Sequence, residues 1–130
     1  MAIKYRLNPT VTNADLDRLY ASAWPNHQPP YDFRPELEHA LAFAGAYADD
    51  ELIGFVRLAW DGGAHAFLLE PTVHPDFRRR GIGRSLVERV VAAAREHGME
   101  WVHVDHTPDL RDFYRARGFT ATDAGLIRLH

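Results

Sequence analysis

The most constraining feature of this sequence is an amphipathic stretch that begins after Gly81 and lies between two short apolar runs. Apolar residues recur every four positions along it, at Ile82, Leu86, Val90 and Ala94. This spacing predicts a helix with one buried face. The flanking runs, residues 66–73 and 101–104, predict strands. A strand, a helix and a second strand in this order form a βαβ crossover, which makes the two strands parallel.

The remaining patterning surrounds this crossover with further strands and short helices. Strands are expected at residues 3–7, 43–48, 51–60, 119–122 and 125–129, and helices at 13–22, 36–42 and 107–117. Asn13 is the expected N-cap of the first helix. Residues 24–35 hold four prolines, which excludes regular structure there. The expected fold class is therefore α/β, with a mixed, mostly antiparallel central sheet covered by helices in a single domain, residues 1–130.

Composition limits the chemistry that this chain can perform. The 130 residues include no cysteine, which excludes disulfides, thiolate metal sites and an acyl-cysteine intermediate. No apolar run is long enough for a membrane-spanning helix, so no membrane partner is expected. The first residues lack the basic flank and apolar run of a secretory signal, and the expected location is the cytoplasm.

The charges divide unevenly along the chain. Residues 1–77 carry 5 Lys and Arg against 11 Asp and Glu, whereas residues 78–130 carry 10 against 7. Acidic residues offset the arginines overall, and no stripe of alternating aromatic and basic residues occurs, so nucleic-acid binding is not expected. The spacing of His103 and His106 fits no strong zinc signature, and no metal is expected.

Two glycines and a run of arginines join the strand that ends at Val73 to the amphipathic helix. Gly81 and Gly83 let the backbone approach a ligand closely, and the helix N-terminus favours an anion. Arginine forks suit phosphate oxygens. The turn lacks the Gly-Lys-Ser/Thr ending of a P-loop and the third glycine of a dinucleotide-binding fingerprint. It therefore predicts a pyrophosphate site of another kind.

The pattern Arg78-x-x-Gly81-x-Gly83 resembles the acetyl-CoA loop of the GNAT N-acetyltransferase superfamily, in an uncharacterised bacterial branch. A second block, from Asp112 to Phe119, resembles the Phe-Tyr-x-x-x-Gly-Phe segment of that family. The resemblance implies a GNAT-like fold with acetyl-CoA as co-substrate. The residues that it implies for binding acetyl-CoA are Thr72, Val73, Arg78, Arg79, Arg80, Gly81, Ile82, Gly83, Arg84, Ser85, Phe113, Tyr114 and Arg117.

The resemblance also implies a reaction, in which an acetyl group passes directly from acetyl-CoA to a primary amine of a small molecule or peptide in a ternary complex. Tyr114 occupies the family's general-acid position, and a phenol stays protonated at neutral pH. Three residues are candidates for the general base. Strand alternation places Glu70 on one face with Leu68 and Thr72, whereas His103 and Asp105 share a face of the last predicted strand before residue 107.

Two questions stay open at the level of sequence. A non-catalytic acyl-CoA-binding or regulatory domain on the same fold is the alternative to an enzyme. The acceptor is also undetermined. The acidic first part and the aromatic residues of the proline-rich segment favour a cationic amine, but a packed connector is the other interpretation; the segment's residues of interest are Trp24, His27, Tyr31, Asp32 and Phe33. The resemblance is compatible with a homodimer.

Overall fold

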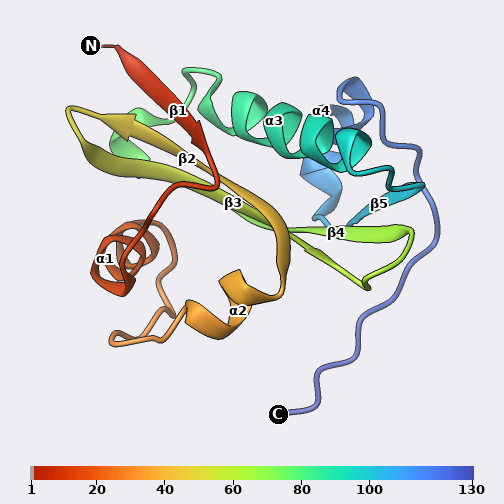
Figure 1. Cartoon of the computed structure of the whole chain (residues 1–130), viewed down its shortest axis with the longest axis horizontal. Coiled ribbons are helices and arrows are strands. Elements are labelled where there is room, and N and C mark those ends of the chain that lie inside the picture. The colour runs from red at the N-terminus through yellow and green to blue at the C-terminus, as the bar shows by residue number, and fades with distance from the viewer. Residues whose placement is uncertain (1) are drawn as a thin grey trace.

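A five-stranded sheet forms the centre of the computed structural model, which describes residues 2–130 (Figure 1). Its strands lie side by side in chain order: β1 (Ile3–Leu7), β2 (Ala40–Ala48), β3 (Glu51–Trp60), β4 (His65–Val73) and β5 (Trp101–Val104). Neighbouring strands from β1 to β4 are antiparallel, and β5 is parallel to β4. The mixed, mostly antiparallel sheet expected from the sequence is confirmed.

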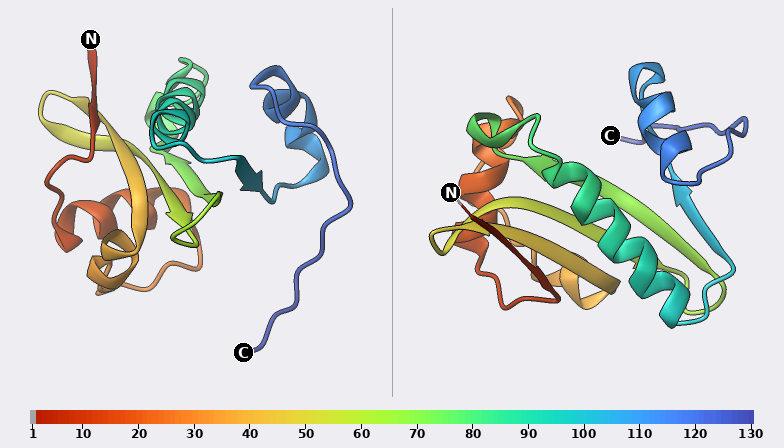
Figure 2. Two further views of the ribbon diagram at one scale, coloured as in Figure 1. Left: turned by 45° about the vertical axis from the view of Figure 1, so that its right-hand side comes forward. Right: turned by 90° about the horizontal axis from the view of Figure 1, so that it is seen from above.

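Helices cover both faces of this sheet. On one face lie α1 (Asn13–Ala23) and α2 (Arg34–Glu38); on the other lie α3 (Ile82–Glu96) and α4 (Arg111–Ala116). Figure 2 shows α3 crossing the strands and α4 following β5 at the end of the sheet. Short 3-10 turns, Pro75–Phe77 and Pro108–Leu110, precede α3 and α4. None of the helices in residues 2–130 is long and apolar enough to cross a membrane.

The sheet buries apolar side chains on both faces, in two separate clusters. The α3-side cluster joins the helix to the central strands through Ala44, Ala46, Ala48, Ile53, Val56, Leu58, Ala66, Leu68, Ile82, Leu86, Val87, Val90, Ala94 and Tyr114. The α1-side cluster consists of Leu16, Leu19, Tyr20, Phe33, Tyr47, Leu52 and Phe55. Burying one large aliphatic side chain contributes about 1.5 to 3 kcal/mol. The two clusters therefore fix α1 and α3 on opposite sides of one sheet.

The short second helix and the strand after it begin earlier than the sequence pattern indicates. The helix was expected at residues 36–42, but α2 ends at Glu38 and β2 begins at Ala40. Pro35 stands in the first turn of α2, where the missing N–H of proline costs no hydrogen bond. Ala40 and Ala42 instead pair with β3, because burial in the sheet outweighs the helix propensity of alanine.

The two closing strands expected at residues 119–122 and 125–129 are wrong. Within the described chain, residues 119–130 form neither helix nor strand. An alternating pattern produces a strand only where an edge is available to pair with it, and β5 offers an edge of four residues. The tail remains exposed, with Leu126, Ile127 and Leu129 at 84%, 83% and 76% exposure.

The first helix is capped by Thr12, not by Asn13 as expected. Thr12 Oγ1 accepts a hydrogen bond from the Asp15 N–H at 3.1 Å, and Asp15 Oδ2 accepts one from the Thr12 N–H at 3.3 Å. This reciprocal capping box satisfies two backbone donors. The Asn13 side chain is used elsewhere, because its Oδ1 accepts from the Phe33 N–H at 2.9 Å.

We expect Thr12→Ala to lower the free energy of unfolding by about 1 kcal/mol, because it removes the cap of α1. Urea denaturation followed by circular dichroism measures this change. Thr10→Ala is the matched control, since Thr10 is exposed and lies outside any helix or strand. Equal losses in the two variants would contradict the assignment of the cap.

Candidate functional site

The loop between β4 and α3 has a backbone shape that suits an anion. Arg79 has φ +64° and Gly81 has φ +75°, both in the left-handed region. Left-handed residues between right-handed ones turn successive N–H groups toward one side and form a concave nest. Gly81 is also the N-cap of α3 and makes no side-chain capping bond, so the first N–H groups of the helix are left for another acceptor.

A cavity of about 220 Å³ lies against this loop. It is lined by Val73, Phe77, Arg78, Arg79, Gly81, Ile82, Gly83, Arg84 and Phe113. A Cβ placed on Gly81 would meet no atom within 4 Å, and one on Gly83 would meet only Val73 Cγ2 at 3.9 Å. The two glycines therefore leave open space over the nest. The fold brings Phe113 of α4 to this loop, as the sequence predicts.

Five predicted cofactor residues lie outside this cavity. The Arg80 guanidinium lies 5.2 Å from the centre of the Phe77 ring, and Arg117 stands in the same relation to Phe113. The Ser85 N–H donates to the Gly81 carbonyl within α3. Thr72 and Tyr114 are buried, and their surroundings are described below.

The strand that leads into the loop has one open edge. The pairing of β4 with β5 ends at Leu68 and Val104, whereas β4 continues to Val73. From Leu69 to Val73, β4 pairs with β3 on one side only. The two strands therefore diverge after Leu68 and Val104, which leaves one edge of β4 unpaired near Val73. Backbone groups along this edge are placed to bind an extended ligand.

A β-bulge interrupts β4 at Glu70. Phe55 pairs with Thr72 and Arg57 pairs with Leu69, so β4 has one residue more than β3 between these pairs. Glu70 adopts φ +51°, in the left-handed region. Because the extra residue reverses the alternation, Leu68 packs in the α3-side cluster while Thr72 is buried toward α1. The expectation that Glu70, Leu68 and Thr72 share one face is wrong for this reason.

The Thr72 side chain links the bulge to the end of α1. Its hydroxyl accepts a hydrogen bond from Trp24 Nε1 at 2.9 Å and donates one to the Glu70 carbonyl at 2.8 Å. Thr72 is 2% exposed. Its side chain is therefore occupied in holding the bulge, and its predicted contact with the cofactor is not available to the hydroxyl.

The Glu70 carboxylate points to an ion cluster that the sequence reasoning missed. Arg57 Nη2 lies 3.6 Å from Glu70 Oε1 and 3.1 Å from Glu36 Oε1. Arg57 comes from β3 and Glu36 from α2. A signal was present in the sequence, because Arg57 is the only charged residue in the interior of an otherwise apolar strand. The partners of Arg57 depend on tertiary structure and had no local signal.

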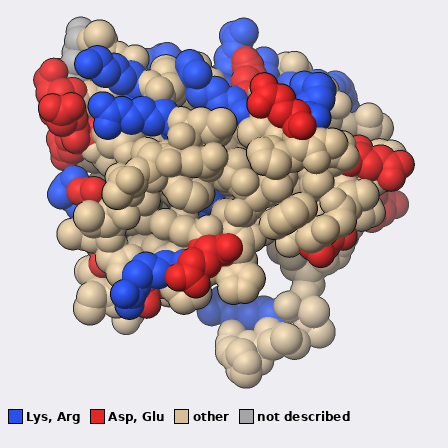
Figure 3. Space-filling view, in the orientation of Figure 1, with Lys and Arg blue, Asp and Glu red and all other residues tan. Residues whose placement is uncertain are grey.

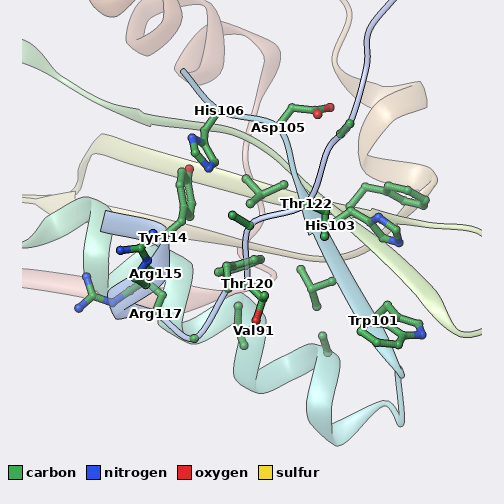
Figure 4. A pocket seen from close by; sticks show the side chains of 18 of the residues that line it. Val91, Trp101, His103, Asp105, His106, Tyr114, Arg115, Arg117, Thr120 and Thr122 are labelled. Carbon is green, nitrogen blue, oxygen red and sulfur yellow. The ribbon is translucent and has the colours of Figure 1, made fainter. Parts of the chain in front are cut away.

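The other two candidate bases lie elsewhere on the sheet. His103 Nε2 is 2.7 Å from His65 Nδ1, and the His103 ring stacks on Phe67 with a centroid distance of 4.8 Å. Asp105 follows the end of β5. Both line a larger cavity of about 820 Å³ beside β5, α4 and the tail (Figure 4). Glu70 is not among its lining residues, and its carboxylate instead contacts Arg57.

Tyr114 is buried in the α3-side cluster and borders the larger cavity. Burial raises the pKa of its phenol above the usual value. The His106 ring stacks on it at 5.0 Å between centroids, and Figure 4 shows the two side chains next to each other. The spacing of His106 from His103 gave no sign in the sequence that His106 lies beside Tyr114. Tyr114 is thus a protonated donor at neutral pH.

One part of the proline-rich segment is packed against the domain, and another part is exposed. His27 Nε2 lies 2.7 Å from Asp17 Oδ1, and Phe33 is buried in the α1-side cluster. These contacts confirm the packed connector for that part of the segment. Trp24 and Tyr31, however, are each 44% exposed. The segment therefore holds two aromatic surfaces in fixed positions.

Charge is distributed unevenly over the molecule. Figure 3 shows basic side chains gathered along the upper rim of the view, with acidic ones among them. This rim corresponds to the α3 and α4 side of Figure 1. Within residues 2–130, no group of three or more His, Cys, Asp and Glu residues is arranged to hold a metal ion.

Residues 12–119 match the model of the acetyltransferase (GNAT) family. This chain belongs to that family. Serotonin N-acetyltransferase 2, chloroplastic, of Oryza sativa subsp. japonica is 36% identical over 99 residues, which cover 73% of this chain and 49% of the rice protein. The share of the curated relatives that the chain spans varies: it is 45% and 43% for two ycf52 proteins, and 67% and 68% for two others.

Solved structures show the same GNAT fold. A GNAT-family acetyltransferase from Streptococcus pneumoniae TIGR4 has a TM-score of 0.81 at 24% identity, over 99% of this chain and 98% of that chain. Aminoglycoside N-acetyltransferase AAC(6')-Iy, solved in complex with CoA, has a TM-score of 0.77 at 22% identity, over 99% and 95% of the two chains. The GNAT-like fold inferred from the two sequence blocks is confirmed.

We expect Gly81→Ala to lower the free energy of unfolding of this GNAT domain by about 1 to 2 kcal/mol, because a Cβ is unfavourable at a left-handed φ. The space around Gly81 is open, so the loss comes from the backbone and not from a clash. Gly125→Ala is the control, since it is equally open and carries no left-handed φ. Denaturant unfolding measures both, and equal values would contradict strain at Gly81.

Proposed function

We propose that this GNAT domain transfers an acetyl group directly from acetyl-CoA to a primary amine of a small molecule or peptide, in a ternary complex. One observation carries the proposal: the open edge of β4 runs from the bulge at Glu70 into the 220 Å³ cavity beside the anion nest. A ligand with a pyrophosphate group and an amide-containing arm fits this arrangement, with the pyrophosphate in the nest and the arm along the open edge of β4. Glu70 stands at the far end of that edge, with its carboxylate turned to Arg57 of β3.

The nest and its arginines are the proposed pyrophosphate site. The first N–H groups of α3 provide hydrogen bonds and a favourable dipole, which contributes only about 0.3 to 1 kcal/mol per charge. Arg78, Arg79 and Arg84 line the same cavity and add charge-assisted hydrogen bonds. The pantetheine amides then pair with the free backbone groups that lead to Val73. CoA in the solved aminoglycoside enzyme supports acetyl-CoA as the donor.

The proposed chemistry needs one proton acceptor, one proton donor and backbone N–H groups. Glu70 takes a proton from the acceptor ammonium, and the neutral amine attacks the thioester carbonyl. The oxyanion receives hydrogen bonds from N–H groups on the open edge of β4. As the C–S bond breaks, Tyr114 gives its proton to the departing thiolate, and the second proton that the amine nitrogen loses returns to the Tyr114 phenolate. The absence of cysteine agrees with direct transfer, without an acyl-cysteine.

The acceptor is proposed to be a cationic amine. Trp24 and Tyr31 are exposed on the α1 side of the sheet, and Trp24 is tied through Thr72 to the bulge. Glu36 and Glu70 outnumber Arg57 in the adjoining cluster. Aromatic faces and excess negative charge both attract an ammonium group. The name of the rice relative, a serotonin N-acetyltransferase, places aromatic monoamines among the acceptors to test.

Calorimetry with CoA and thiol release from acetyl-CoA test this function. The acceptor panel contains tryptamine, spermidine, kanamycin and a lysine peptide. We expect CoA binding together with thiol release for at least one amine. CoA binding without acetylation of any amine would favour an acyl-CoA-binding domain without turnover. If CoA does not bind, both functions are excluded.

We expect Tyr114→Phe to lower kcat by about 10²-fold or more while the KM for acetyl-CoA changes little, because it removes the proposed general acid. Steady-state kinetics with varied acetyl-CoA measures both constants. Tyr47→Phe is the control, since Tyr47 is a buried tyrosine of the α1-side cluster. Unchanged kcat, with chemistry shown to be rate-limiting, would remove Tyr114 from the mechanism.

The choice of base is tested by the dependence of kcat/KM on pH. We expect Glu70→Gln to abolish the acidic limb of this profile, because only the base must lose a proton for the reaction. His103→Ala should keep the limb, since His103 is bonded to His65 on another part of the sheet. The reverse result would assign the base to His103.

A further inference from the structure

Arg57 is a charged side chain in a buried position. It lies on β3 between buried Val56 and Leu58, and its own side chain is 12% exposed. An apolar residue of similar volume is often as stable or more stable at such a position than a buried ion pair. Stability alone therefore does not account for an arginine here.

The guanidinium connects three elements at the bulge. It reaches Glu36 of α2 at 3.1 Å and Glu70 of β4 at 3.6 Å, from its own place on β3. The Glu70 backbone is held separately by the hydroxyl of Thr72. A residue with φ +51° is strained unless its surroundings fix it, and here both its carbonyl and its side chain have partners. Arg57 is the partner of the side chain.

The guanidinium is shared unequally between its two carboxylates. Glu36 is nearer, with a side chain 26% exposed against 49% for Glu70. Glu36 Oε2 is buried and has no hydrogen-bond partner in residues 2–130. Because Glu36 makes the closer contact, Arg57 interacts with both carboxylates and not with Glu70 alone. The Glu70 carboxylate is the more exposed of the two.

Two tyrosines lie near the carboxylates of Glu36 and Glu70. Burial, then the charge of Glu70, raises the pKa of Tyr20 on α1. Burial, then the charge of Glu36, raises the pKa of Tyr31 in the loop before α2. Both phenols are therefore neutral at physiological pH. Arg57 is thus the cation that faces Glu70, and Glu36 is the competing anion.

We infer that Arg57 is a positioning residue for catalysis: it holds the Glu70 carboxylate on the α1 side of the sheet, where the proposed acceptor surface of Trp24 and Tyr31 lies, while Glu36 holds Arg57 in place. This inference rests on the proposed function, in which Glu70 accepts the proton of the amine. Arg57 itself touches neither acetyl group nor amine. It acts through Glu70.

A double-mutant cycle tests this inference through kcat/KM for thiol release, using an amine of the panel that is acetylated. Arg57→Met should lower kcat/KM about tenfold or more, through kcat and not through the KM for the amine, because the carboxylate is no longer held in place. Arg57→Lys should restore part of this loss. Glu36→Gln should lower kcat/KM less than Arg57→Met does, because Arg57 keeps its contact with Glu70. The affinity for CoA should stay within about twofold in all three, since the nest lies at the other end of the edge.

The same substitution in the Glu70→Gln variant makes the result decisive. In Glu70→Gln, Arg57→Met should cause little further loss, because the group through which it acts is gone. Losses that multiply would overturn the positioning role and leave the base assignment intact. If Glu70→Gln has no effect on kcat, both the base assignment and this inference are overturned.

Control variants distinguish a loss of activity caused by a misplaced Glu70 from one caused by unfolding. Arg18→Met removes an exposed arginine that pairs with Asp15 and Glu51, and it should leave the pH profile and kcat unchanged. Circular dichroism shows whether each variant is folded. Where Arg57→Met does not fold, Arg57→Lys in the two backgrounds completes the cycle. An unchanged kcat in folded Arg57→Lys and Arg57→Met would contradict the inference.

Discussion

The packing of α3 on the sheet is the interaction on which the rest of this structure depends. A Cβ on Gly54 of β3 would lie 3.1 Å from both Ile82 Cγ2 and Leu86 Cδ1, so the glycine lets the first turn of the helix rest directly on the strand. This contact fixes where α3 begins. The loop from β4 must then return to that point, and it does so through left-handed Arg79 and Gly81. The anion nest is thus a result of helix packing.

The bulge in β4 is the second constraint, and it divides the strand into two parts. Before Glu70 the strand contributes Leu68 to the α3-side cluster, and after it the strand contributes Thr72 to the α1 side. One inserted residue therefore gives the same strand an apolar contact with α3 and a polar contact with Trp24. The side chain at the insertion reaches the ion cluster of Arg57 and Glu36.

The sequence was sufficient for the features that depend on local patterns. The stripe of α3 and the alternation of the strands have fixed spacing, and they predicted the sheet and the crossover. The residues of the smaller cavity other than Phe77 followed from the resemblance to the GNAT family. The bulge was not predictable in this way, because an added residue looks like ordinary alternation until the partner strand is known. The same holds for Arg57, whose isolated charge was visible but whose partners were not. The tail shows the opposite error. Residues such as Ile127 to Leu129 have the alternating pattern of a strand, but no strand of the described chain pairs with them.

The two clusters have a consequence for how such a domain can diverge. The nest, α3 and α4 lie on one side of the sheet, whereas α1 and the segment with Trp24 and Tyr31 lie on the other. Because the side chains of the two clusters point to opposite faces, substitutions in α1 or in that segment can accumulate without repacking the helix that forms the nest. The sheet thereby lets the proposed acceptor surface change over evolutionary time while the proposed acetyl-CoA surface is retained.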